Sequence, residues 1–175
     1  HMWECNEIPV SVEHLAASAT QVILSERFMK HRRPEYALEA VIACVPNELH
    51  DIGTLIIADV CEAAGWRAVL LGSNTPARDL LRFLGQRTRL PDLLALSITL
   101  PANRPALQDA LTAITDRYPD LRIVVGGQAL DGPAEAITFR KSLLACYPSV
   151  RHVSTLDALE RALTRPSELE LAQFG

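Results

Sequence analysis

A short polar motif contains the residues best suited to bind a metal. It occupies residues 46–53, where Glu48, His50, Asp51 and Gly53 follow an apolar run. Imidazole is a common metal ligand, and a carboxylate that accepts a hydrogen bond from the second ring nitrogen fixes the tautomer and raises the basicity of the ring. Glu48, two residues before His50, can supply that carboxylate. The motif therefore predicts a histidine that ligates a metal from one side.

Other functions fit this loop less well. A phosphate-binding loop needs glycines or a Lys–Ser/Thr pair, and the charge of Glu48 would repel phosphate. A magnesium pocket of the receiver type needs clustered acids at the first strand and a late lysine, which the sequence does not place there. A lone histidine most often packs or caps, but the acids and Gly53 around His50 favour a ligand.

The motif joins a strand to a helix within a regular alternation of both. Strands are predicted at 40–45, 68–71, 93–98, 121–125 and 150–153, and helices at 11–30, 52–64, 76–84, 105–118, 133–144 and 156–164. Ser11 and Thr75 are predicted helix caps, with Pro76 in the first turn. The first helix is predicted to be amphipathic, with an apolar face formed by Val12, Leu15, Ala16, Ala19, Val22, Ile23 and Met29.

Strands that alternate with helices predict an α/β fold with a five-stranded, parallel, doubly wound sheet in the flavodoxin-like order 2-1-3-4-5. Apolar runs in place of strict alternation indicate that helices cover both faces of the sheet. In such sheets, ligands bind beyond the carboxyl ends of strands one and three, where the winding reverses. The loops at those ends are 46–51 and 99–104, so the polar motif falls at the predicted ligand edge.

Composition limits the class of protein. The net charge of −4 and the lack of a long basic cluster argue against direct contact with nucleic acid. Four cysteines without a CxxC pair argue against a structural zinc site. Because the sequence has no membrane-length apolar run and no signal peptide, we expect a cytoplasmic protein that contacts no membrane.

Residues 1–2 have the character of a cloning scar. We expect a helical segment at 1–34 and the α/β domain at 35–175.

The motifs together resemble a known family. Glu48-x-His50-x-x-Gly53, followed by Ser97 and by Gly126-Gly127 after the next two strands, resembles the Rossmann-like cobalamin-binding domain of methionine synthase, the mutases and light-responsive regulators of the CarH/AerR/PpaA type. The resemblance covers about residues 37–165. The family commonly has Asp at the first position, where this chain has Glu48, a residue that also occurs among the regulators.

The resemblance implies a role for each motif residue. His50 would replace the cofactor's own base beneath cobalt, as the metal ligand, and Glu48 would hold the other ring nitrogen. The displaced nucleotide tail would pass along the sheet, where small residues leave space for it. The cofactor-binding residues expected within the α/β domain are Glu48, His50, Asp51, Gly53, Ser97, Thr99, Gly126 and Gly127.

A second resemblance lies upstream. Trp3, nine residues and then Glu13-His14 match the Trp-x9-Glu-His pattern of CarH-type photoreceptors, in which a helical cap covers the upper face of the corrin. The resemblance implies that Trp3, Glu13 and His14 contact the upper ligand. Glu4 stands where the photoreceptors have the histidine that captures cobalt after illumination, so the resemblance does not extend to that light adduct.

These resemblances imply a tetrapyrrole-binding sensory domain, without enzymatic activity, of a bacterial light- or redox-responsive transcription regulator or antirepressor. The expected cofactor is cobalamin; haem is the alternative, as in the AppA-type variant, although haem has no tail to fill the slot. A repressor or other regulatory protein is the expected partner, and a homo-oligomer is compatible with the sequence. Two alternatives stay open: a cobalamin-carrying module of a methyltransferase or mutase, and an interaction domain that has lost its cofactor.

Overall fold

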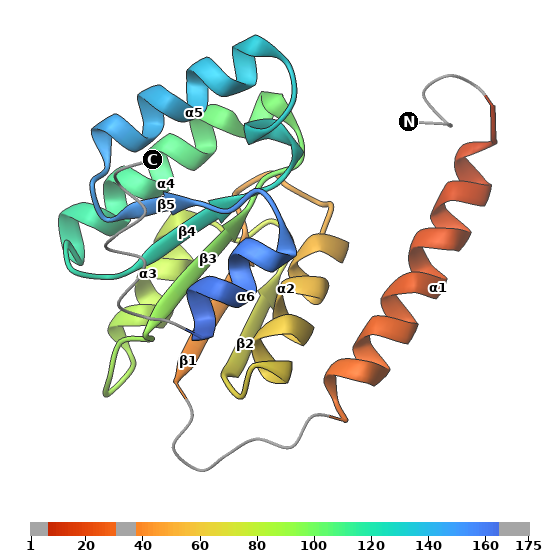
Figure 1. The fold of residues 1–175 in the computed structure, drawn as a ribbon, viewed down its shortest axis with the longest axis horizontal. Coiled ribbons are helices and arrows are strands. Elements are labelled where there is room, and N and C mark those ends of the chain that lie inside the picture. The colour runs from red at the N-terminus through yellow and green to blue at the C-terminus, as the bar shows by residue number, and fades with distance from the viewer. Residues whose placement is uncertain (1–6, 31–37, 165–175) are drawn as a thin grey trace.

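Five parallel strands form the centre of the structure, a computed structural model that describes residues 7–30 and 38–164 (Figure 1). The strands are β1 (Glu39–Cys44), β2 (Arg67–Gly72), β3 (Leu93–Ser97), β4 (Ile123–Gly126) and β5 (Val150–His152). Their order in the sheet is β2-β1-β3-β4-β5. The predicted fold class, strand order and reversal between β1 and β3 are therefore confirmed.

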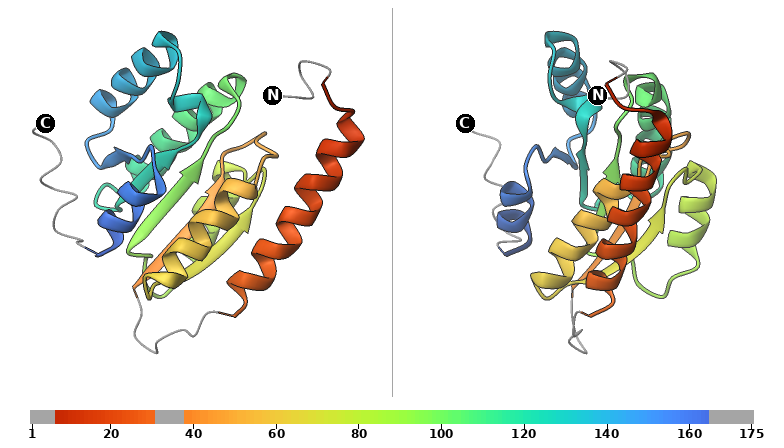
Figure 2. Two further views of the ribbon diagram at one scale, coloured as in Figure 1. Left: turned by 45° about the vertical axis from the view of Figure 1, so that its right-hand side comes forward. Right: turned by 90° about the vertical axis from the view of Figure 1, so that its right-hand side faces the viewer.

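Helices cover both faces of this sheet, as the apolar strands require. One face packs against α2 (Ile52–Ala63) and α6 (Leu156–Thr164), and the other against α3 (Ala77–Gly85), α4 (Arg104–Arg117) and α5 (Ala134–Cys146) (Figures 1 and 2). Successive residues of a strand serve opposite layers: Leu94 and Leu96 pack toward α3–α5, whereas Leu93 and Ala95 pack toward α2 and α6. Two short 3₁₀ helices, η1 (Pro101–Asn103) and η2 (Gln128–Leu130), follow β3 and β4.

The register of the sheet aligns the ends of its three central strands. Cys44 of β1 pairs with Ser97 of β3, and Ser97 pairs with Gly126 of β4. The last residues of these strands therefore form one row across the carboxyl edge. Because each following loop starts from this row, the loops after β1, β3 and β4 share the same edge.

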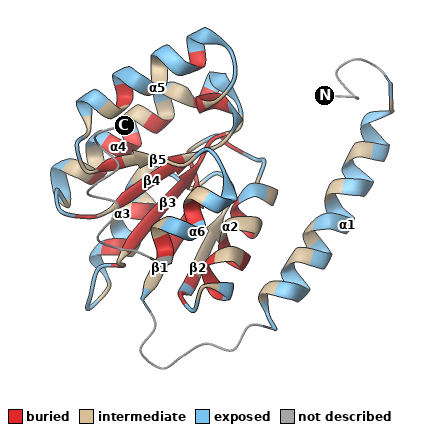
Figure 3. Ribbon diagram, in the orientation of Figure 1, coloured by how far each residue is buried: buried red, intermediate tan, exposed pale blue. Residues whose placement is uncertain are grey.

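Helix α1 (Val10–Phe28) lies outside the sheet, beside α2, and none of its residues is fully buried (Figures 1 and 3). Two side-chain contacts attach it: Gln21 Nε2 donates to Asp51 Oδ1 at 2.6 Å, and Arg27 Nε donates to Asp59 Oδ2 at 2.6 Å. Phe28 packs on the core layer of α2 and α6.

The docked side of α1 differs from the predicted apolar face. Its partly buried positions include Ala17, Gln21, Leu24 and Phe28, which recur at helical spacing. The predicted apolar residues, from Val12 to Met29, are all exposed. Periodicity identified the helix and an apolar face, but did not reveal which face meets the domain.

Two predicted helix starts are displaced by one residue or more. Pro9, not Ser11, occupies the cap position of α1, and Pro76, not Thr75, occupies that of α3. Both prolines have extended backbone angles, which suit the last residue before a helix. Thr75 Oγ1 donates instead to the carbonyl of Gly72.

Within residues 7–30 and 38–164, no helix has both the length and the apolar character needed to span a membrane.

Candidate functional site

The loops after β1 and β3 meet around the carboxylate of Glu48. This side chain is completely buried, and both of its oxygens accept hydrogen bonds. Oε1 accepts from the backbone N–H of His50 at 3.1 Å and from His50 Nδ1 at 2.6 Å. Oε2 accepts from the backbone N–H groups of Thr99 and Leu100 at 2.8 and 2.9 Å, and from Asn103 Nδ2 at 3.1 Å. We call this set of donors the Glu48 clamp.

The clamp keeps Glu48 ionised. Burial alone raises the pKa of the Glu48 carboxyl, but the hydrogen bonds from Leu100, His50 and Thr99 outweigh burial and lower its pKa to about 2. A carboxylate in this state can only accept hydrogen bonds. The proton shared with His50 therefore belongs to Nδ1 of the imidazole.

The imidazole of His50 is held at one nitrogen and faces solvent with the rest of the ring. Its side chain is 51% exposed, whereas its partner Glu48 is 0% exposed. With the proton on Nδ1, the lone pair lies on Nε2, the arrangement of a histidine ligand oriented by a carboxylate. The predicted Glu48–His50 pair is thus formed, with the geometry that metal ligation needs.

Neighbouring loops support the clamp from outside. Asn47 and Asn74 both have positive φ angles, of 65° and 45°. The N–H of Asn47 donates to Asn74 Oδ1 at 2.8 Å, and the N–H of Asn74 donates to the carbonyl of Glu48 at 2.8 Å. Below them, Cys44 Sγ lies 3.6 Å from the carbonyl of His50, and burial, followed by the charges of Glu48 and Asp51, raises the pKa of this thiol to about 12. Cys44 is therefore an inert thiol beneath the loop.

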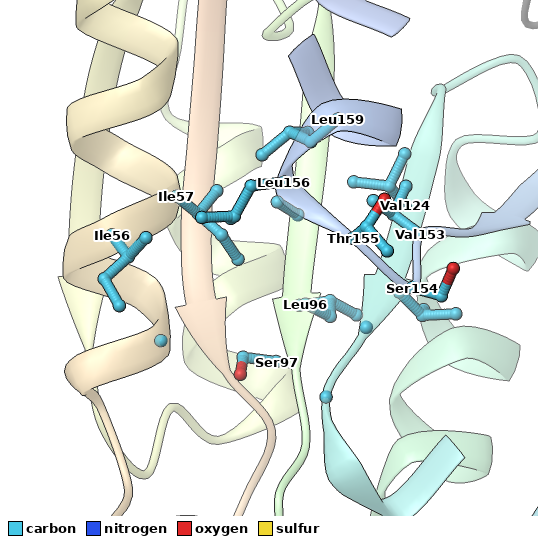
Figure 4. A pocket seen from close by; sticks show the side chains of 15 residues that line it. Ile56, Ile57, Leu96, Ser97, Val124, Val153, Ser154, Thr155, Leu156 and Leu159 are labelled. Atoms are coloured by element: carbon cyan, nitrogen blue, oxygen red, sulfur yellow. The ribbon is translucent and has the colours of Figure 1, made fainter. Parts of the chain in front are cut away.

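A slot lies next to the loops of the clamp, between α2 and α6. Its volume is about 260 Å³. Figure 4 shows Ile56 and Ile57 of α2 on one side, Leu156 and Leu159 of α6 on the other, and strand residues between them. Four of the predicted tail-slot residues line it: Gly53, Ser97, Gly126 and Gly127.

Two of the three glycines that line this slot, Gly126 and Gly127, cannot carry side chains in the observed backbone. A Cβ on Gly126 would lie 2.8 Å from the carbonyl oxygen of Val153, and one on Gly127 would lie 2.2 Å from that of Ile98. Gly127 also has a φ of 116°, which side chains rarely adopt. A Cβ on Gly53 would meet Ser97 Oγ at 3.6 Å, an ordinary contact. The first two glycines are thus required by the approach of neighbouring backbone.

The other predicted site residues are more dispersed. Thr99 is not among the residues that line the slot, and its N–H contributes to the Glu48 clamp instead. Asp51 occupies the cap position of α2 and accepts a hydrogen bond from Gln21 of α1. Glu13 and His14 lie on α1, where their side chains approach each other at 3.7 Å. Trp3 lies outside the described residues.

Sequence reasoning missed three parts of the site. The backbone N–H groups of Thr99 and Leu100 donate hydrogen bonds to Glu48. Backbone donors of this kind cannot be predicted from the identity of the side chains. Asn103 was also missed, although an Asn between Pro101 and Pro105 at a strand-to-helix turn is a visible polar signal. The Asn47–Asn74 contact depends on two loops that only the sheet brings together.

The donor set is suited to a metal that arrives with most of its ligands. Across the part of the chain that the structure describes, no three His, Cys, Asp or Glu side chains gather into a metal-binding group. His50 therefore provides a single imidazole at this edge. Leu49 and Leu100, which are 70% and 41% exposed, lie in the same two loops and offer apolar surface next to it. A metal held within a large, flat and partly apolar macrocycle is compatible with the lack of a ligand cluster among the described residues, with the single imidazole and with the apolar surface beside it.

Comparisons with known proteins show the family of the chain. Residues 38–147, well over half of the chain, match the model of the B12 binding domain family. The HTH-type transcriptional repressor CarH of Myxococcus xanthus is 33% identical over 130 residues, which are 73% of this chain and 42% of CarH. The repressor CarA of the same organism is 31% identical over 125 residues, which are 69% of this chain and 41% of CarA. The chain thus spans less than half the length of either repressor.

Solved structures share the fold at lower sequence identity. The methanol:cobalamin methyltransferase complex MtaBC from Methanosarcina barkeri superposes with a TM-score of 0.61 and 17% identity, over 98% of this chain and 61% of that chain. The monomethylamine corrinoid protein of the same organism gives a TM-score of 0.66 and 14% identity, over 85% of this chain and 65% of that chain.

Proposed function

Because this chain belongs to the B12-binding domain family, with cobalamin as its cofactor, we propose that it is the sensory domain of a bacterial transcription regulator. The observation that carries the proposal is the Glu48 clamp beside the slot. It presents Nε2 of His50 at the ligand edge of the sheet, next to a cleft lined by Gly53, Ser97 and Gly126. A single imidazole beside a cleft of about 260 Å³ fits a metal held in a macrocycle that carries a tail.

In this proposal His50 would ligate cobalt, and Glu48 would maintain the tautomer of the His50 ring. The tail would occupy the slot, whose lining includes Gly53, Gly126 and Gly127. Ser97 offers a hydroxyl inside the slot as a hydrogen-bond donor. Leu49 and Leu100 would offer exposed apolar surface to the ring of the cofactor. When bound, the cofactor would supply a metal with an exchangeable ligand that can respond to light or redox state.

A tail slot favours cobalamin over haem, which has no tail. The identity to CarH and CarA, both named as repressors, supports a regulatory role without catalysis and a partner among transcription factors. We further propose that residues 1–34 belong to a helical cap that includes Trp3, Glu13 and His14. The exposed apolar residues of α1 support this, because a helix face of that kind is normally covered by other helices.

A signal at the upper face would act by changing how α1 docks on the domain. A ligand shifts such an equilibrium only through different contacts in the two states. Gln21 of α1 bonds to Asp51, which is the next residue after His50, so α1 and the ligand loop already share a contact. DNA contact and light sensing would then belong to the assembled regulator.

Absorbance spectra test the proposal. The protein is mixed separately with adenosylcobalamin, hydroxocobalamin and hemin, freed of unbound pigment, and measured in the dark and after illumination. We expect a cobalamin spectrum that changes on His50→Ala, with affinity lowered by about 10-fold or more, equivalent to at least about 1.4 kcal/mol. His152→Gln, which changes a histidine outside the clamp and slot, should leave the spectrum unaltered at neutral pH.

Each other outcome identifies an alternative. Hemin binding without cobalamin binding would make the domain a haem sensor. Binding of neither would leave a cofactor-free interaction domain. Methyl transfer or a mutase reaction by the complete protein would reassign the domain to an enzyme. An unchanged cobalamin spectrum in His50→Ala would remove His50 as the ligand.

A further inference from the structure

The inner part of the slot is lined by hydrocarbon side chains alone. Ala95 of β3, Val124 of β4 and Leu159 of α6 belong to one buried cluster, and each is at most 4% exposed. Ile57 of α2 and Val153 are partly buried and pack against the same cluster. All five residues line the slot, and we call them the slot floor. A ligand that reaches the floor therefore meets no side-chain donor or acceptor there.

The polar side chains of the slot lie at its rim. Ser97 is the last residue of β3, two residues after Ala95, so it lies toward the carboxyl edge of the sheet (Figure 4). Ser154 and Thr155 are exposed and belong to the turn before α6. Thr155 Oγ1 already accepts a hydrogen bond from the N–H of Ala158 at 3.2 Å. The slot thus has a polar rim and an apolar floor.

The backbone of the floor offers no further partners. Ala95 and Val124 pair with each other inside the sheet, where neighbouring strands take up the backbone groups of β3 and β4. Ile57 lies within α2, and the N–H of Leu159 donates to the carbonyl of Thr155 within the first turn of α6. A polar ligand atom pressed against this floor would lose its water and find no replacement, which is costly.

The size of the slot limits what can enter it. Its volume of about 260 Å³ lies below the range of roughly 300–1,000 Å³ that is common for complete small-molecule sites. A bicyclic base at the end of a tail is a suitable occupant, whereas a whole macrocycle is too large. The bases of corrinoid tails differ in polarity: the six-membered ring of dimethylbenzimidazole is pure hydrocarbon, whereas that of adenine carries two nitrogens and an amino group.

We infer that the slot selects corrinoids with a benzimidazole tail over corrinoids with a purine tail, and that Val124 and Leu159 determine this preference. The inference rests on the proposed function, because it specifies which form of the cofactor the same site takes. The hydrocarbon ring of the base faces the floor, and its nitrogens stay at the rim near Ser97. A purine in this place buries polar atoms against Val124 and Leu159. Apolar pockets discriminate against an added polar group by roughly 10- to 100-fold.

The first test uses the free bases and needs no cobalt. Methyl groups of Val and Leu are isotopically labelled, and their NMR signals are followed while dimethylbenzimidazole or adenine is added at millimolar concentration. We expect dimethylbenzimidazole to shift the methyl signals of Val124 and Leu159, and adenine at equal concentration to cause about a tenth of that shift or less. The methyl signals of Val41, which is buried on the opposite face of the sheet, should stay in place.

The second test compares three corrinoids: cobalamin, the same corrinoid with an adenine tail, and cobinamide, which has no base. Each is titrated into the wild type, Val124→Thr and Val41→Thr. Threonine keeps the shape of valine and adds one hydroxyl, which at position 124 can pair with a polar atom of adenine. The bond between cobalt and its own base is the same for a given corrinoid whichever variant binds it, so comparison of the proteins cancels that contribution.

We expect Val124→Thr to shift the preference toward the adenine tail by roughly 2- to 10-fold, the range for one gained hydrogen bond. Val41→Thr, which adds the same hydroxyl at a buried position of β1 outside the slot, should leave the preference unchanged. Cobinamide should bind all three proteins equally, because it places nothing in the slot.

The two tests separate the inference from the proposed function. Equal shifts of the Val124 and Leu159 signals by both bases, or an unchanged preference in Val124→Thr, would overturn the inference. A wild-type protein that binds no corrinoid would contradict the proposed function, while the free bases would still decide the preference of the slot. If Val124→Thr does not fold, Ile57→Thr takes its place, at a partly buried position of the slot floor.

Discussion

At the scale of single residues, hydrogen bonds explain how a charged carboxylate can be fully buried. An isolated buried charge is costly, and Glu48 has no lysine or arginine among its hydrogen-bond partners in the described structure. Five N–H donors replace the water that it loses. The same donors make Glu48 an obligate acceptor, so its influence on His50 follows directly from its burial.

Glu48→Gln tests this dependence. The substitution keeps the shape but replaces one oxygen with an NH₂ group that faces N–H donors, so at least one buried donor loses its acceptor. We expect the free energy of unfolding of the cofactor-free protein to fall by about 1–3 kcal/mol, measured by urea titration.

The matched control for this substitution is Glu135→Gln. Glu135 is 86% exposed and bonds to Arg104 at 3.0 Å, so we expect a change within about 0.5 kcal/mol. Equal effects of the two substitutions would mean that the Glu48 clamp adds nothing to stability.

The residues of the site were predictable only as far as side chains could reveal them. Glu48 and His50 are two positions apart and both chemically conspicuous, so their pairing could be inferred. The donors from Thr99 and Leu100 are backbone groups, and their positions depend on how the chain turns after β3. Asn103 lies 55 residues from Glu48 in sequence. The residues around Asn103 therefore do not reveal that its side chain contacts Glu48.

At the scale of secondary-structure elements, the loop after β4 depends on a glycine that lacks both space and an ordinary backbone conformation. Gly127 and Gly132 have nearly the same φ, 116° and 114°, but a Cβ would collide with Ile98 only at Gly127. This pair therefore separates the cost of backbone strain from the cost of the close approach of two chain segments.

We expect Gly132→Ala to lower the free energy of unfolding by about 1–3 kcal/mol through strain. Gly127→Ala should lower it further and also weaken cobalamin binding, because the loop must move where it borders the slot. Chemical denaturation and a binding titration measure the two effects. Equal losses of stability, with unchanged binding in both variants, would contradict a role for the contact between Gly127 and Ile98.

Helix α1 illustrates what periodicity can and cannot predict about an element. Spacing of apolar residues located the helix, because the pattern repeats every three or four residues. It could not show that Gln21 and Arg27 would dock on α2, since both are ordinary polar residues in sequence. The strands were easier: each is an apolar run bounded by turn residues, and the sheet buries both of its faces.

Removing the two polar contacts of α1 should loosen the helix without unfolding the sheet. For Gln21→Ala combined with Arg27→Ala, we expect faster amide hydrogen exchange within α1 and a change in the global unfolding free energy below about 1 kcal/mol, because no α1 residue is fully buried. Arg78→Ala, which removes an exposed ion pair within α3, should leave exchange in α1 unchanged. Unaltered exchange in the double variant would show that these two contacts do not hold α1.

At the scale of the whole molecule, a partly buried histidine links β5 to α5 through the carboxylate of Asp131. His152 of β5 lies 3.3 Å from Asp131, and Asp131 bonds to Arg140 of α5 at 2.6 Å. Burial lowers the pKa of His152; attraction to Asp131 opposes this change and the charge of Arg140 adds to it. The folded protein therefore favours the neutral imidazole more than the unfolded chain does.

This difference predicts a pH dependence with a definite sign. Because the unfolded chain binds the proton more readily, stability is lost as pH falls below about 6.5, the ordinary pKa of histidine. We expect His152→Gln to reduce this loss when urea midpoints at about pH 7.5 and 5.5 are compared. A variant with the full pH dependence of the wild type would assign the loss to other groups.

The Glu48 clamp has a consequence for the thermodynamics of cofactor capture. Every group that holds the His50 ring comes from the chain itself, so the ring loses its rotational freedom when the chain folds. Ordering a side chain at a binding interface costs about 0.5–1.5 kcal/mol, and here that entropy is already lost before any metal approaches. Less of the free energy of the nitrogen–metal bond is then spent on ordering the His50 ring, so more of it contributes to binding affinity. Folding also sets the direction from which the metal must approach Nε2.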